Sequence, residues 1–222
     1  MVRKRRDRVA TILPILKAEY PHARCSLDFS TPLELLVATI LSAQCTDERV
    51  NKTTPALFAR YPTARAYADA DAAELETFVG SCGFFRQKAK AIRSMAFDVA
   101  TKHAGEVPRT MDALTALAGV GRKTANVVLG NAFATPVGVT VDTHVGRLSR
   151  RLGLTRHDDA VKVEHDLVAC VPREEWTHWS HLLIYHGRRT CRSQNPRCDA
   201  CALLEHCPTG PKLLKQRSSG KR

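Results

Sequence analysis

Four cysteines near the C-terminus constrain the fold of this chain more strongly than any other feature of its sequence. Cys191, Cys198, Cys201 and Cys207 follow the spacing C-x6-C-x2-C-x5-C. The segment around them has no helical period and is rich in Arg, Asn and Pro, so something other than an apolar core must hold it. Four thiolates suit one zinc ion or a [4Fe-4S] cluster, and their chemistry alone hardly separates the two. The spacing therefore predicts a metal centre rather than a chance grouping of cysteines.

The charge balance of the chain indicates a polyanionic partner. Lys and Arg number 34 against 22 Asp and Glu, which gives a formal net charge of +12. Nucleic acid is the first candidate, although ribosomal and membrane-surface proteins can share this balance. Sequence motifs are needed to decide among these classes.

Cysteine usage and hydropathy indicate an intracellular protein that is not secreted. The N-terminal basic residues precede a short apolar run, Val9 to Leu16, which Pro14 interrupts. No cleavage site follows this run, and no stretch of about 18 apolar residues predicts a membrane span. We therefore expect no membrane association, and a cytoplasmic or nucleoid location if the source is bacterial. In a reducing compartment the four scattered cysteines are expected to be small buried apolar residues: Cys25, Cys45, Cys82 and Cys170.

The pattern of apolar residues predicts an all-α fold of short helices. Capping boxes at Thr31 to Glu34 and at Asp71 to Glu74 begin two of them. Glycines at positions 105, 153 and 187 are expected to end three others, and the basic segment 209–222 is expected to be disordered. The predicted helices span residues 32–44, 47–59, 71–80, 85–103, 111–117, 122–133, 143–152, 159–170 and 173–187.

A glycine-rich turn between two helices has the pattern of a helix-hairpin-helix. Gly119, Val120 and Gly121 separate a short helix from one that begins with Arg122 and Lys123. Glycines let the backbone of the turn approach a ligand closely, and the free N–H groups at the start of the second helix attract a phosphate. An ordinary pair of antiparallel helices is the alternative, but the adjacent basic residues favour a DNA contact.

Lys123 and Asp142 are candidate catalytic residues. Lys123 falls in the first turn of its helix, where the positive end of the helix dipole disfavours an ammonium and so favours the nucleophilic neutral amine. Asp142 precedes the helix that ends near Leu152. The alternatives are that Lys123 only neutralises phosphate and that Asp142 only caps its helix. From pattern alone, both assignments stay open.

Four separate motifs together resemble the endonuclease III family of helix-hairpin-helix DNA glycosylases, in its iron-sulfur subgroup. The resemblance covers nearly the whole chain. The motifs are Leu41-Ser42-Ala43-Gln44, the hairpin Gly119-Val120-Gly121-Arg122-Lys123-Thr124-Ala125, Val141-Asp142-Thr143-His144, and His186-Gly187-Arg188 leading into the cysteine loop.

The resemblance implies a bifunctional DNA glycosylase and abasic-site lyase of base excision repair. The lysine at the position of Lys123 attacks C1′ of a flipped nucleotide, and the aspartate at Asp142 assists the proton transfers. β-Elimination from the resulting imine then breaks the strand 3′ to the abasic site. The four-cysteine spacing is that of the family's [4Fe-4S] loop. The resemblance therefore favours an iron-sulfur cluster over zinc.

The resemblance also implies two α-helical domains and a DNA partner. A six-helix domain spans residues 25–134, and residues 1–24 with residues 135–208 form the iron-sulfur domain, with the active site in the cleft between them. The expected substrate is double-stranded DNA that contains damaged pyrimidines or abasic sites, bound by a monomer.

Two residues match the family positions that fill the space left by the flipped nucleotide. These are Gln44 and Phe84, for which the alternatives are a helix-terminal glutamine and a buried phenylalanine. Further DNA contacts are expected from the motifs and from the arginines of the cysteine loop, whose phosphate contacts a metal would hold in place. The predicted set is Gly119, Val120, Gly121, Arg122, Thr124, His144, Arg188, Arg192 and Arg197.

Two other functions compete with this one. An adenine glycosylase of the same fold would use water in place of a lysine, and would need a carboxylate late in the helix of residues 32–44. The segment between Leu35 and Cys45 contains no acid. A non-enzymatic DNA-binding module with a zinc-stabilised loop would make Lys123 and Asp142 incidental.

Overall fold

A computed structural model describes residues 2–219 of the chain. Throughout these residues the regular elements are helices, which confirms the predicted all-α class. None of the described helices is long and apolar enough to cross a lipid bilayer. The elements are α1 (Val2–Glu19), α2 (Pro32–Leu41), α3 (Asp47–Arg60), α4 (Ala64–Ala68), α5 (Ala72–Val79), η1 (Gly80–Cys82), α6 (Phe85–Lys102), α7 (Met111–Thr115), α8 (Arg122–Ala132), α9 (Thr143–Arg151), α10 (Ala160–Val168), η2 (Arg173–Glu175), α11 (Trp176–Arg189), η3 (Cys198–Ala200), η4 (Leu204–His206) and α12 (Gly210–Ser219).

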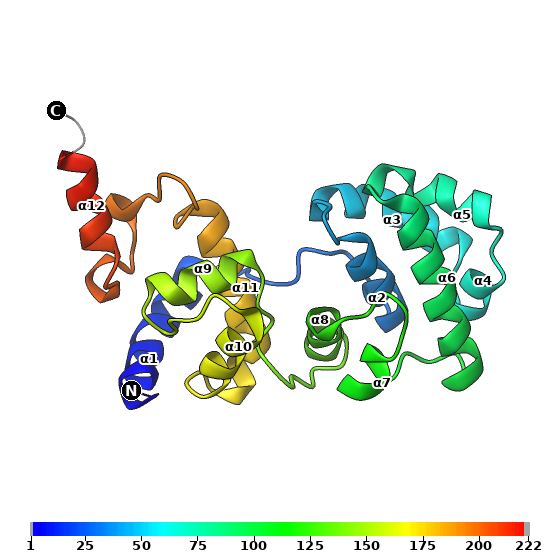
Figure 1. Ribbon diagram of the computed structural model, residues 1–222, viewed down its shortest axis with the longest axis horizontal. Coiled ribbons are helices and arrows are strands. Elements are labelled where there is room, and N and C mark those ends of the chain that lie inside the picture. The colour runs from blue at the N-terminus through cyan, green and yellow to red at the C-terminus, as the bar shows by residue number, and fades with distance from the viewer. Residues whose placement is uncertain (1, 220–222) are drawn as a thin grey trace. The chain divides into compact units, whose positions relative to one another are not determined.

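The chain divides into two compact units, and the second is made from two separate stretches of sequence. One unit comprises Cys25–Val137, and the other combines the residues before Cys25 with those from Gly138 onward. In this second unit α1 packs against α11, although most of the chain separates them in sequence (Figure 1).

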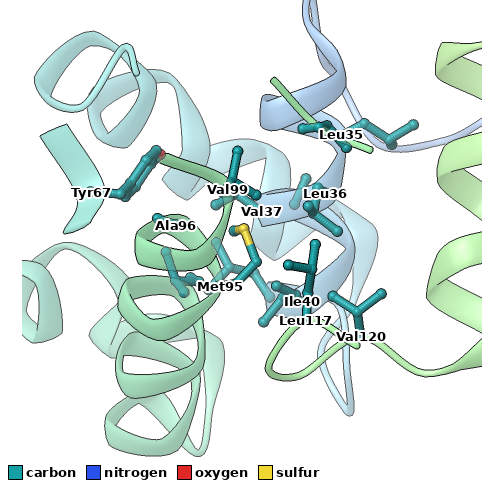
Figure 2. Packing of buried hydrophobic residues seen from close by; sticks show 14 of the residues in the cluster. Leu35, Leu36, Val37, Ile40, Tyr67, Met95, Ala96, Val99, Leu117 and Val120 are labelled. Atoms are coloured by element: carbon teal, nitrogen blue, oxygen red, sulfur yellow. The ribbon is translucent and has the colours of Figure 1, made fainter. Parts of the chain in front are cut away.

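The core of the unit 25–137 lies where α2, α6 and the α7–α8 hairpin meet. Figure 2 shows Val37 and Ile40 of α2 together with Met95 of α6 and the two hairpin residues Leu117 and Val120. All of these side chains are buried. Because α2 is apolar on nearly every face, it is covered on several sides, and it holds the hairpin and the start of α6 in one framework.

The capping box predicted for α2 is confirmed. The Thr31 hydroxyl accepts a hydrogen bond from Glu34 N, and the Glu34 carboxylate accepts one from Thr31 N. The helix nevertheless ends at Leu41, three residues before the predicted end. Within residues 25–137 there are seven α-helices rather than six, because the five-residue α4, which Thr63 caps, was not predicted.

The unit that contains both ends of the chain has its own core, and two helices differ there from the prediction. α1 was not among the predicted helices; it buries Val9, Ile12 and Leu16 in this core and contains Pro14 in its interior. Gly187 was predicted to end a helix, but α11 continues to Arg189. The glycine serves instead a close approach of α9, since a Cβ there would lie 2.7 Å from His144 Nδ1.

The segment predicted to be a disordered tail contains a helix. Gly210–Ser219 forms α12, and residues 220–222 lie outside the described part of the chain. Two contacts explain the order: the Thr209 hydroxyl donates to Arg151 O at 2.7 Å, and Gly210 N donates to Cys207 Sγ at 3.3 Å. The cysteine loop therefore supports the start of the helix, which composition alone does not indicate.

Candidate functional site

The turn between α7 and α8 has the conformation that the glycines were predicted to allow. Gly119 has a φ of +75°, in the left-handed region that favours glycine. A Cβ at this position would also lie 3.0 Å from Ala91 Cβ of α6. Val120 N donates to Leu117 O and closes the turn. The Val120 side chain is buried in the core, so only its backbone is available to a ligand.

Lys123 is exposed on the first turn of α8. Gly121 is the N-cap of this helix and supplies no side-chain hydrogen bond to the N–H groups that follow. The first N–H groups of a helix have no intrahelical acceptor, and the helix dipole adds positive potential there. The hairpin therefore combines a site for an anionic group with an exposed primary amine.

Gln44 and Phe84 share an unusual backbone conformation. Both are non-glycine residues in the left-handed region, with φ values of +52° and +46°. Both are exposed, and Phe84 is 61% exposed although it is a large aromatic residue. The alternative of a buried Phe84 is therefore wrong. Non-glycine residues in the left-handed region cluster at active sites and ligand-binding segments.

Asp142 caps α9 and belongs to a polar cluster in the unit that contains both chain ends. Its Oδ1 accepts a hydrogen bond from Val145 N at 2.7 Å. Its Oδ2 makes no hydrogen bond with any residue that the structure describes. Burial lowers the pKa of the nearby His144, against the opposing effect of Asp142, and the charges of Arg147 and Arg188 lower that pKa further.

The four cysteines of the C-terminal loop line one hollow. Cys191, Cys198, Cys201 and Cys207 share it with apolar side chains of α9, η4 and α12. Burial, together with the charges of the other three cysteines, raises the pKa of Cys201 to about 11. Within residues 2–219 no group of three His, Cys, Asp or Glu side chains is arranged around a position for a single metal ion.

Several hydrogen bonds point at the sulfur atoms of this hollow. Arg151 Nη1 lies 3.3 Å from Cys191 Sγ, and His186 Nε2 lies 3.5 Å from Cys201 Sγ. Gly210 N donates to Cys207 Sγ. The N–H donors of Arg151 and Gly210 stabilise the negative charge of thiolate ligands.

Two arginines of α9 that sequence reasoning missed organise the backbone of the cysteine loop. Arg151 donates to the carbonyls of Arg192 and Ser193, and Arg147 donates to those of Gly187 and Cys191. The predicted DNA contacts Arg188, Arg192 and Arg197 are exposed around this loop. In the sequence, the signal for this role is the presence of three arginines, at positions 147, 150 and 151, in the helix predicted over residues 143–152.

The predicted site residues fall into two groups. The unit 25–137 contains Gln44 and Phe84. It also contains the hairpin, with Lys123, Arg122 and the half-buried Thr124. The other unit contains Asp142 and His144, together with the loop arginines and the four cysteines.

Comparison with known proteins identifies relatives over nearly the full length of the chain. The model of the HhH-GPD superfamily of base excision DNA repair proteins matches residues 37–173. Endonuclease III of Synechocystis is 54% identical over 92% of this chain and 94% of its own length. Endonuclease III of Escherichia coli is 40% identical over 88% of this chain and 92% of its own length.

Solved structures agree with the sequence relatives. A non-covalent endonuclease III–DNA complex superposes with a TM-score of 0.89 at 43% identity, covering 95% of this chain and 98% of that chain. A trapped endonuclease III–DNA covalent intermediate gives 0.88 at the same identity, covering 94% and 98%.

Proposed function

The chain belongs to the endonuclease III family of the HhH-GPD superfamily, and from this we propose that Lys123 excises damaged pyrimidines from DNA through an imine. It is a base excision repair enzyme, a DNA glycosylase and abasic-site lyase. The observation that carries the proposed mechanism is the exposed amine of Lys123 beside the N–H groups at the start of α8. We propose that the enzyme acts on double-stranded DNA as a monomer.

The hairpin can bind the strand and present the nucleophile at once. A phosphate held by the N-terminal N–H groups of α8 would place the adjacent sugar near Lys123. The neutral amine attacks C1′, the glycosidic bond breaks, and the base leaves with the bonding electrons and takes up a proton. Opening of the sugar ring leaves an iminium, which acidifies the C2′ hydrogen, and loss of that proton expels the 3′ phosphate.

Asp142 supplies a carboxylate for the proton transfers of this sequence. Oδ1 is held by Val145 N, so the carboxylate has a defined orientation, while Oδ2 can accept the proton that the attacking amine must lose. The capping role and the catalytic role therefore use different oxygens of one side chain.

Gln44 and Phe84 would occupy the space that the flipped nucleotide leaves. Removal of a base from the stack costs a few kcal/mol, and side chains that replace its contacts lower this cost. The exposure of Phe84 and the left-handed backbone of both residues support this role.

The four cysteines fit a [4Fe-4S] cluster as their cofactor. Four thiols line one hollow, and N–H groups of Arg151 and Gly210 donate to two of the sulfurs. Four cysteine thiolates are the usual ligand set of such a cluster. When bound, it would fix the loop that presents Arg188, Arg192 and Arg197 to phosphates. Purified protein should be yellow-brown and contain iron, and one zinc with no iron would overturn this assignment.

Borohydride trapping on a duplex with one abasic site tests the proposed mechanism. The unaltered enzyme should form a covalent protein–DNA adduct, because borohydride reduces an imine to a stable amine. Lys123→Gln should abolish both trapping and excision while retaining most DNA binding, which depends mainly on phosphate contacts. The matched control Lys90→Gln removes an exposed lysine of α6 and should trap normally.

Each alternative function predicts a different result in this assay. Neither alternative would be trapped on the abasic duplex. On a duplex that carries a damaged base, a glycosylase that uses water would still release the base, and a binding module would not. If Lys123→Gln is trapped at the unaltered rate, another amine is the nucleophile.

A further inference from the structure

A buried lysine on α6 has no part in the chemistry described above. Lys88 is only 6% exposed. Its Nζ donates to Leu41 O at 2.7 Å and to Cys82 O in a second, shorter hydrogen bond. Burial of a charged side chain is costly unless its hydrogen bonds repay the loss of water. The two backbone carbonyls must therefore stabilise this buried ammonium.

The two acceptors of Lys88 lie two and three residues before the two left-handed residues. Leu41 is the last residue of α2, three positions before Gln44, and Cys82 is the last residue of η1, two positions before Phe84. One ammonium therefore links two segments that are about forty residues apart in sequence. Each segment ends in an exposed side chain on strained backbone.

The surroundings of Lys88 show that the two carbonyls are its principal partners. Burial lowers the pKa of its ammonium, while Cys45 and Cys82 raise it by their charges, and no carboxylate contributes. Hydrogen bonds from a charged donor to backbone carbonyls are stronger than neutral ones. Carbonyls at the ends of helices are free to accept them and carry partial negative charge.

We propose that Lys88 is a positioning residue that holds Gln44 and Phe84 at a fixed separation, so that both can enter the duplex together. The inference rests on the proposed function, because it assumes that these two side chains replace the flipped nucleotide. Non-glycine residues in the left-handed region persist only where surrounding contacts enforce them. Lys88 supplies one such contact to each segment.

Substitution of Lys88 by methionine tests the proposal. Met keeps the length and fills the same space, but it cannot donate to Leu41 O or Cys82 O. Lys90→Met on the same helix is the matched control, since it makes the same charge change at an exposed position. The substrates are a duplex with a paired damaged pyrimidine and a single strand with a ready-made abasic site, on which nothing has to be unstacked.

We expect Lys88→Met to lower kcat/KM on the paired lesion about tenfold or more, and to change cleavage of the single-stranded abasic site by less than about twofold. Lys90→Met should leave both rates unchanged. In a background of Gln44→Ala with Phe84→Ala, Lys88→Met should cost little more, because a residue that acts through two side chains loses its effect without them.

The outcomes separate this inference from the proposed function. If the unaltered enzyme is not trapped on an abasic duplex, the proposed function fails. If Gln44→Ala impairs the paired substrate but Lys88→Met does not, only the role of Lys88 fails. Equal losses for Lys88→Met on both substrates, or undiminished losses in the background without Gln44 and Phe84, also overturn it. If Lys88→Met does not fold, Lys88→Gln, which retains one donor group, is measured in the same assays.

Discussion

Replacement of Gly187 by alanine tests how closely α11 approaches α9, the helix that begins at Asp142. A Cβ on Gly187 would lie 2.7 Å from His144 Nδ1, 3.1 Å from His144 Cβ and 3.1 Å from Arg147 Nη2. The imidazole and guanidinium can rotate away, but His144 Cβ cannot move without α9. The two helices must therefore separate slightly.

Gly146 of α9 provides a matched control for this substitution. Its added Cβ would meet Arg150 Nη1 at 3.6 Å and Val141 Cγ1 at 3.8 Å, which are ordinary contacts. Each Gly→Ala change gains about 1 kcal/mol of helix propensity. The gain cancels between the two variants, so their difference reports the overpacking at Gly187 alone, which we expect to be about 1–3 kcal/mol.

The assay is thermal unfolding of both variants and of the unaltered protein under identical conditions. For a chain of this size, about 1–3 kcal/mol corresponds to a Tm about 2–12 °C lower for Gly187→Ala than for Gly146→Ala. The rate of borohydride trapping should also fall more for Gly187→Ala, because α9 carries Asp142 with it. Equal melting temperatures for the two variants would refute the close approach.

Three further predictions concern single side chains. Asp142→Asn should retain the helix cap and the Tm but lower excision at least about a hundredfold, as single-turnover kinetics would measure; an unchanged rate would leave only the capping role. Arg151→Met should reduce the iron bound per chain, measured by metal analysis, because the loop loses three hydrogen bonds; full iron content would contradict this. Burial raises the pKa of Asp166, but hydrogen bonds from Thr155 and Arg5 outweigh it and leave the pKa lowered. Asp166→Asn should therefore destabilise by about 1–3 kcal/mol near pH 7, and the difference should shrink as the pH falls from about 4, where the unfolded carboxyl takes up its proton, through the lower pKa of the folded state; a difference independent of pH in urea titrations would show that its charge is unimportant.

Features set by neighbouring residues could be predicted from the sequence. The capping box of Thr31 and Glu34 depends on a three-residue spacing, and the hairpin turn depends on the left-handed backbone at Gly119. The starts of α2, α8 and α9 agree with their predicted positions for the same reason. Such signals act within one or two turns of helix, where pattern and propensity are informative.

Features set by distant residues could not be predicted. Gly187 looks like a helix end until the approach of His144 is known, and α12 looks disordered until the contacts of Thr209 and Gly210 are known. Lys88 has two acceptors, one of which is 47 residues away. For the candidate site, residue types and motifs identified Lys123 and Asp142, whereas the strained backbone of Phe84 and its exposure required coordinates.

The second unit combines residues from both ends of the chain, so it cannot be completed on the ribosome until residues 25–137 have been made. The apolar face of α1, with Val9, Ile12 and Leu16, is made before residues 25–137, yet the helices that cover it follow Gly138. The whole of Cys25–Val137 must be translated in between, which takes roughly 6–23 s at about 5–20 residues per second. The intervening unit can fold during that delay, while α1 waits uncovered and open to chaperones. The cysteine loop follows the hairpin by about seventy residues, so a metal bound by its four thiolates would be acquired after residues 25–137 have been made.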